Sequence, residues 1–183
     1  MVLYHGTILT YAQNICNNGI DVNYKESQRK TDFGAGFYVT NNYNFAERCA
    51  RTKSAFHFED ESLNSTPAIV ILKYDISNER YYRKMYFQKP DKSWGQFVCY
   101  HRFPEVAYKN QLLYEHFDVV TGPVLDGQLY EFKNIIREHN YILSDEVLSQ
   151  MVPFQMEHTF AIQKSFHNQD LVSCLRVIGY DII

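Results

Sequence analysis

Two short segments of the chain combine a histidine or a tyrosine with glycines. Leu3–Thr7 reads LYHGT, and Asp32–Thr40 reads DFGAGFYVT. A glycine lets the backbone approach a ligand that a side chain would hold off. His5 can hydrogen-bond such a ligand, and Tyr38 offers a flat face for stacking. Taken singly, each fits a structural role as well, a partly buried imidazole and a core tyrosine, but the presence of both segments favours a binding site.

A third segment, Glu157–His167, alternates between polar and apolar residues as a β-strand does. The alternation predicts a strand over residues 159–166, with small and polar side chains on one face. Gln163 lies on that face, either in a cleft or simply toward solvent. The nearest carboxylate on the same face is Glu157, six residues away along an extended strand, too far to act with Gln163.

Together, the first two segments resemble the NAD-binding half of the ADP-ribosyltransferases, in the branch of diphtheria-toxin-like toxins and poly(ADP-ribose) polymerase catalytic domains. The chain also resembles, over nearly its full length, the DUF3990-like bacterial family of small stand-alone domains of unknown function. Segments 94–98 (WGQFV) and 118–124 (DVVTGPV) match that small family. The resemblance implies an α+β ADP-ribosyltransferase fold, in which two small packed sheets flank an NAD cleft with helices around them.

The resemblance also assigns roles within the site. His5, Tyr38 and Gln163 are expected to be catalytic, and no metal is expected. The residues expected to bind NAD are His5, Gly6, Thr7, Gly36, Phe37 and Tyr38. In the family the Gly6 backbone pairs with the nicotinamide carboxamide, the histidine holds the adenosine-side ribose and the tyrosine stacks on the ring.

Two positions depart from the family pattern. Gln163 stands where many relatives have glutamate, and a neutral hydrogen bond in place of a charged one would slow the reaction roughly ten- to thirtyfold. Mono-ADP-ribosylation is therefore expected rather than chain elongation. The second aromatic residue that sandwiches the ring in relatives would fall near Arg48 or Cys49, so Phe45 or another tyrosine is expected to replace it.

The function implied is transfer of ADP-ribose from NAD to a protein or nucleic acid, in a toxin of a toxin–antitoxin or phage-defence system with a cognate antitoxin. An NAD glycohydrolase, an inactive NAD- or nucleotide-binding module and an RNA 2′-phosphotransferase remain alternatives. The last needs several arginines in the cleft, and Arg29 is the only one between the first two segments. Arginine-directed transfer is disfavoured because the arginine, the serine-threonine-serine string and the paired glutamates that it uses are not present at suitable positions.

A basic and aromatic stretch, Lys73–Lys92, is the best candidate for contact with RNA or DNA, because single-stranded nucleic acid needs cations and stacking faces. An exposed edge strand and loop, with charges that keep the protein soluble, explains the same composition. Protein acceptors are favoured on family grounds.

The composition fits one domain over residues 1–183, with 45% hydrophobic residues and a net charge of −3 that gives no general attraction to polyanions. The four cysteines are widely spaced, which predicts free thiols, and no segment has the length of a membrane span or the pattern of a secretion signal. A cytoplasmic protein is expected. Periodicity and breaker residues predict helices over 9–18, 42–56, 93–102, 126–140, 144–151 and 168–178, and strands over 2–5, 36–40, 68–76, 118–124, 159–166 and 180–183.

Overall fold

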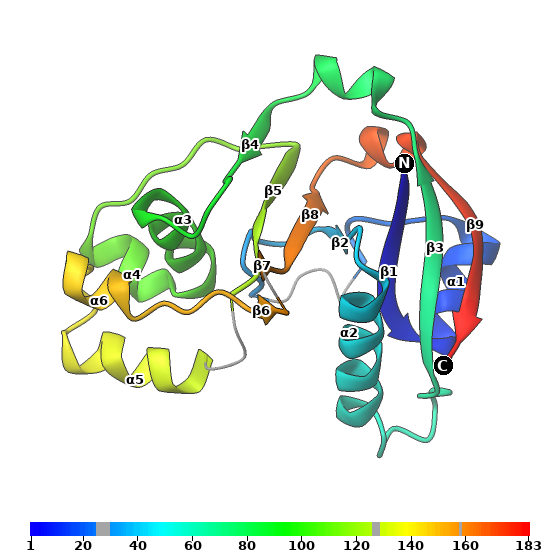
Figure 1. The fold of residues 1–183 in the computed structure, drawn as a ribbon, viewed down its shortest axis with the longest axis horizontal. Coiled ribbons are helices and arrows are strands. Elements are labelled where there is room, and N and C mark those ends of the chain that lie inside the picture. The colour runs from blue at the N-terminus through cyan, green and yellow to red at the C-terminus, as the bar shows by residue number, and fades with distance from the viewer. Residues whose placement is uncertain (25–29, 126–128, 158) are drawn as a thin grey trace.

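The structure is a computed structural model that describes residues 1–24, 30–125, 129–157 and 159–183. Its strands and helices are mixed without regular alternation, so the fold class is α+β, as predicted. The described strands form a three-stranded sheet, a four-stranded sheet and a two-stranded hairpin (Figure 1).

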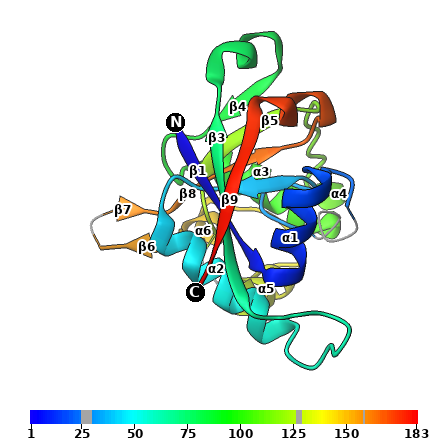
Figure 2. The ribbon, with the colours of Figure 1, turned by 90° about the vertical axis from the view of Figure 1, so that its right-hand side faces the viewer.

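The three-stranded sheet is antiparallel, in the order β1 (Val2–Ile8), β3 (Pro67–Tyr74), β9 (Leu175–Ile182). Side chains alternate along the central strand β3, so Val70 faces the main core with Ala12 of helix α1 (Leu9–Asn18). Ile69 faces the other way, toward Ala46 of helix α2 (Tyr43–Phe56). The two helices therefore cover opposite faces of this sheet (Figure 2).

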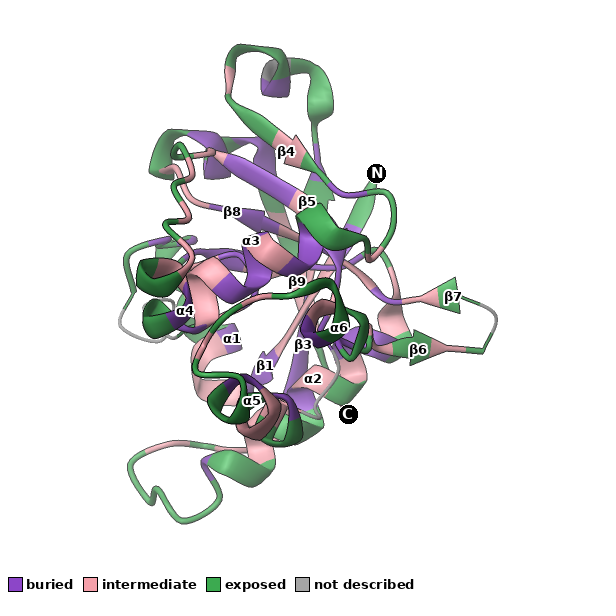
Figure 3. Cartoon of the chain, turned by 90° about the vertical axis from the view of Figure 1, so that its left-hand side faces the viewer, coloured by how far each residue is buried: buried purple, intermediate pink, exposed green. Residues whose placement is uncertain are grey.

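The four-stranded sheet has the order β2 (Phe37–Val39), β8 (Ile162–Phe166), β5 (Val119–Pro123), β4 (Lys84–Tyr86). Its central strands β5 and β8 are largely buried (Figure 3). A second core joins this sheet to helices α3 (Lys92–Arg102), α4 (Pro104–Lys109), α5 (Leu129–Glu138) and α6 (Asp145–Ser149). Trp94 is the largest fully buried side chain there, and its Nε1 donates to the Pro123 carbonyl at 2.9 Å, which gives the residue a structural role.

The two larger sheets meet at one backbone pair. Tyr4 of β1 and Thr40, just after β2, exchange two hydrogen bonds of 2.8 and 2.9 Å. The main core runs beneath this junction, with Leu3 from one sheet and Phe37 from the other. Beyond Tyr4, β1 continues along β3 while β2 follows β8, so the edge of β1 is left without a strand partner.

The predicted strand over 159–166 is broken at Ala161. Residues before the break form β7 (Thr159–Phe160), which pairs with β6 (Gln155–Met156) in a hairpin, and only β8 joins the four-stranded sheet. The Ala161 amide donates to the Phe154 carbonyl, and its own carbonyl accepts from Val124, so tertiary hydrogen bonds override the sequence alternation at this point.

The helix predicted over 168–178 is wrong. Only a short 3-10 helix, η3 (Gln169–Cys174), forms, and the chain then enters β9. Val177 pairs with Leu72 on the central strand, and a β-branched residue fits a pleated sheet better than a helix. The predicted closing strand exists but begins at Leu175 rather than at Tyr180.

The other predicted elements are confirmed within a few residues. Residues 126–128, with which the predicted helix over 126–140 begins, lie outside the described residues. Asn42 caps α2, its Oδ1 accepting from the Phe45 amide at 2.9 Å. Composition gave no sign of the 3-10 helix η2 (Ile76–Tyr81), of strand β4 or of helix α4. None of the helices in the described part of the chain has the length and apolar character that crossing a bilayer requires.

Candidate functional site

A cavity of about 630 Å³ opens where β1 and β2 diverge, a volume typical of small-molecule sites. Its lining combines segments far apart in sequence: β1, the 31–40 segment, α2, the end of α3 and the start of β8. The lining includes every residue predicted for the site, namely His5, Gly6, Thr7, Gly36, Phe37, Tyr38 and Gln163.

The edge of β1 offers free backbone groups to this cavity. Amide and carbonyl groups point alternately to the two edges of a strand, so those of Gly6 share the direction of those of Tyr4. The Tyr4 groups bond to Thr40, whereas no described residue hydrogen-bonds the Gly6 amide or carbonyl. Gly6 therefore presents one donor and one acceptor side by side in the wall of the cavity.

The structure gives a different reason for glycine at position 6 than access of a ligand. A Cβ atom there would overlap the Ala46 carbonyl oxygen and crowd Cys49 on α2. The missing side chain thus allows α2 to pack directly on β1, while the backbone groups of Gly6 face the cavity edge.

His5 is fixed in one orientation and one tautomer. Its Nδ1 lies 2.6 Å from the Tyr38 carbonyl, which can only accept, so Nδ1 carries the proton. The ring stacks on Phe37 with centroids 4.5 Å apart. Burial and the nearby Lys53 ammonium lower the pKa of His5 to about 4, against a smaller rise from the Tyr38 hydrogen bond. The imidazole is therefore neutral at pH 7, with Nε2 as an acceptor.

Thr7 carries an unsatisfied hydroxyl. The residue is fully buried and lines the cavity, and its Oγ1 has no hydrogen-bond partner in the described part of the chain. Buried hydroxyls are nearly always paired, and an unpaired one costs about 1–3 kcal/mol. The wall thus holds a second group with unused hydrogen-bonding capacity, which is enclosed in this structure and reaches a ligand only after a local shift.

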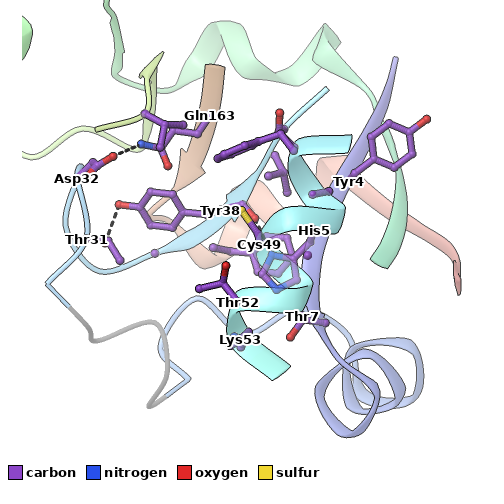
Figure 4. Close-up of a pocket in the computed structure, with 18 of the residues that line it drawn as sticks. Tyr4, His5, Thr7, Thr31, Asp32, Tyr38, Cys49, Thr52, Lys53 and Gln163 are labelled. Atoms are coloured by element: carbon purple, nitrogen blue, oxygen red, sulfur yellow. Dashed lines mark hydrogen bonds between the residues drawn. The ribbon is translucent and has the colours of Figure 1, made fainter. Parts of the chain in front are cut away.

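Tyr38 is anchored through its hydroxyl. This oxygen accepts from the Phe33 amide at 3.0 Å and donates to the Gly34 carbonyl at 2.7 Å, with the Thr31 hydroxyl 2.8 Å away (Figure 4). Burial raises the pKa of Tyr38 well above its ordinary value, so the phenol does not ionise. Tyr38 can offer its ring to a ligand but cannot serve as a base.

Gln163 is held by a carboxylate that the sequence did not indicate. Its Nε2 donates to Asp32 Oδ2 at 2.6 Å, and Asp32 Oδ1 is paired with Arg102 Nε at 2.6 Å. The expectation that Glu157 is the nearest carboxylate on the same strand face is wrong, because Glu157 lies in the turn of the β6–β7 hairpin and does not share a strand with Gln163. Asp32 is part of the quoted second segment, but its contact with Gln163 spans 131 residues and is set by the tertiary fold.

The cavity contains aromatic residues besides Tyr38. Phe45 from α2 and Phe154 line it with ring centroids 5.3 Å apart, and the Arg48 guanidinium lies 4.4 Å from the Phe154 centroid. Cys49, which with Arg48 marks the place where the resemblance expects a second aromatic residue, also lines the cavity, and burial raises the pKa of its thiol to about 11. The sequence suggested Phe45 as a substitute but gave no signal for Phe154.

The Lys73–Lys92 stretch lies outside this cavity and contains η2 and the edge strand β4. Three of its cations have carboxylate partners: Lys84 contacts Glu79 at 4.0 Å, Arg83 contacts Glu115 at 3.4 Å, and Lys92 contacts Asp145 at 2.6 Å. Two of its tyrosines, Tyr81 and Tyr86, are exposed. Arg29, the arginine noted between the first two segments, falls outside the described residues.

These features define a class of protein: an α+β domain with a small-molecule cavity at the junction of two small sheets. The chain belongs to the family described as protein of unknown function (DUF3990), whose family model matches residues 1–177. No curated protein matches the chain.

Proposed function

We propose that this protein has an ADP-ribosyltransferase fold and transfers single ADP-ribose units from NAD to a macromolecule. The observation that carries the proposal is the convergence of His5, Tyr38 and Gln163 on one cavity, beside the unpaired backbone groups of Gly6. These residues come from three separate segments, and the family resemblance alone assigns all three to one site.

The free groups of β1 match the hydrogen-bonding pattern of a carboxamide. A primary amide donates through its nitrogen and accepts through its oxygen, and Gly6 offers a carbonyl and an amide on the same edge. Bonds to both would fix nicotinamide in one orientation, and the Tyr38 ring would supply its stacking face. The preformed edge lowers the entropic cost of holding the substrate in a reactive position.

The remaining groups suit the rest of the dinucleotide. His5 Nε2, an acceptor at neutral pH, and the Thr7 hydroxyl can bond ribose or adenine groups. Arg48 and Lys53 both line the cavity from α2, and cations favour a pyrophosphate. When NAD is bound, its nicotinamide leaves and positive charge develops on the ribose, near which Gln163 offers a neutral oxygen acceptor.

The acceptor is proposed to be a protein. Several cations of the Lys73–Lys92 stretch are neutralised by carboxylates, which weakens the case for a nucleic-acid surface there. Action as a toxin with a cognate antitoxin remains part of the proposal on family grounds.

The test incubates the purified protein with NAD labelled in the adenosine part and a cell lysate, and separates protein, RNA, DNA and free sugar. Label in the protein fraction is expected, with a loss of at least about a hundredfold in His5→Ala. His139→Ala is the matched control, because His139 is exposed directly after the end of α5 and is absent from the cavity lining. Free ADP-ribose alone would indicate a glycohydrolase, and saturable NAD binding without turnover an inactive binding module.

A further inference from the structure

Asp32 is a buried carboxylate in the cavity wall, only 2% exposed, to which the family resemblance gives no role. We infer that Asp32, held by Arg102, positions Gln163 so that the Gln163 side-chain oxygen faces the cavity, and that this contact requires glutamine rather than glutamate at position 163. The part of the inference that concerns NAD rests on the proposed function.

Each hydrogen bond that the structure gives the Asp32 carboxylate comes from an N–H donor. Oδ2 accepts from Gln163 Nε2 at 2.6 Å and from the Leu125 amide at 2.9 Å, and Oδ1 accepts from Arg102 Nε at 2.6 Å. Arg102 is itself anchored, because its NH1 donates to the Lys30 carbonyl at 3.1 Å. A carboxylate is the only side chain of this size that accepts in all of these directions.

This arrangement determines which end of the Gln163 amide faces the cavity. A carboxylate oxygen accepts and cannot donate, so the NH₂ group must point to Asp32 and the oxygen must point away. Figure 4 shows the oxygen directed away from Asp32, on the side of the Tyr38 ring. No described residue donates to this oxygen, and it is not among the fully enclosed polar atoms that lack partners, so it is open to the cavity.

A ligand hydroxyl can therefore donate to a Gln163 oxygen that is held in place before binding. Under the proposed function this hydroxyl belongs to the ribose of NAD. Asp32 and Arg102 are positioning residues, because their charged groups bond to each other and to other protein groups rather than to a ligand in the cavity.

The same contact accounts for the departure from the family's glutamate. A glutamate at 163 would place two carboxylates at hydrogen-bond distance in a buried site, which is tolerable only while one of them holds a proton. As the pH rises that proton is lost and the two charges repel. In this protein the carboxylate is thus at position 32, in contact with Gln163, and not at position 163 itself.

The first experiment measures thermal unfolding as a function of pH, without NAD. Gln163→Glu is expected to lose about 5 °C relative to wild type as the pH rises from about 5 to 8, since each kcal/mol shifts the midpoint of such a chain by about 2–4 °C. Gln155→Glu is the matched control, because it adds the same charge at an exposed position of β6 and should follow wild type. A Gln163→Glu curve parallel to wild type would overturn the inference.

The second experiment measures nicotinamide release with Asp32→Asn. Loss of the fixed amide orientation should lower kcat about tenfold while KM for NAD changes less than about threefold, because an interaction made in the transition state is lost rather than uniform binding. A rise in KM with unchanged kcat would contradict a positioning role. If Asp32→Asn does not fold, the pH dependence of Gln163→Glu still decides whether the contact exists.

The two experiments separate the inference from the proposed function. Wild-type protein that neither binds nor turns over NAD would refute the proposed function and the role toward ribose, yet leave the Asp32–Gln163 contact to the unfolding data. Normal NAD turnover with a pH-insensitive Gln163→Glu variant would refute the contact and leave the proposed function standing.

Discussion

The two walls of the cavity differ in how fully their polar groups are satisfied. On the β1 wall the Gly6 backbone groups and the Thr7 hydroxyl lack partners among the described residues, and His5 keeps one acceptor nitrogen open. On the opposite wall Asp32 accepts three N–H groups and the Tyr38 hydroxyl has three neighbours within hydrogen-bond distance. The first wall has spare capacity for a ligand, and the second is a rigid scaffold that presents one ring and one oxygen.

The strongest test of this comparison removes the cation from the satisfied wall. Arg102→Met leaves the buried Asp32 carboxylate without its counter-ion, and breaking a buried pair in this way costs about 3–5 kcal/mol of unfolding free energy. The exposed pair of Lys92 with Asp145 supplies the matched control, since Lys92→Met should cost less than about 1 kcal/mol. Chemical denaturation measures both.

Equal losses in the two methionine variants would mean that Asp32 is solvated in solution. The description of this wall as a closed hydrogen-bonded network would then have to be abandoned.

On the β1 wall, a smaller change in unfolding free energy, of opposite sign, is expected. Thr7→Val removes a buried hydroxyl that has no partner among the described residues, so the free protein should gain about 1 kcal/mol of stability. Binding of NAD should weaken about fivefold, equivalent to about 1 kcal/mol, measured by titration calorimetry.

Ser165→Ala is the contrasting variant from the four-stranded sheet. Ser165 Oγ bonds to His167 Nε2 at 2.8 Å, so its removal should cost about 1 kcal/mol of stability. A Thr7→Val variant that is destabilised like Ser165→Ala, and binds NAD as wild type does, would show that the Thr7 hydroxyl is satisfied within the protein.

The smallest expected change is in NAD binding as the pH is lowered. An ordinary histidine gains its proton near pH 6.5, whereas the pKa of His5 in the folded protein is about 4, chiefly because of burial. His5 therefore stays a neutral acceptor as the pH falls from 7 to about 5, and NAD binding should remain within about twofold over that range. The free protein loses stability over the same interval, because the unfolded chain takes up the proton first.

Equilibrium binding is therefore measured only where the protein is shown to be folded. An affinity that falls with a midpoint near the ordinary histidine value would mean that His5 is solvated, and the β1 wall would then lack its fixed acceptor.

The sequence by itself determined much of the site. Glycines beside a histidine and a tyrosine, together with the family resemblance, led to seven of the residues that line the cavity, and hydrophobic periodicity predicted most helices and strands. These are local signals, because periodicity and turn residues act within a few positions of the chain.

Only the tertiary structure decided the features that depend on contacts between distant segments. The strand β9 replaces a predicted helix because Val177 and its neighbours pair with β3, about a hundred residues earlier in the chain. The break at Ala161 follows from hydrogen bonds to Phe154 and Val124. The Asp32–Gln163 contact and the free edge of Gly6 arise where the two sheets separate. Local sequence patterns do not specify which distant segments the folded core brings into contact.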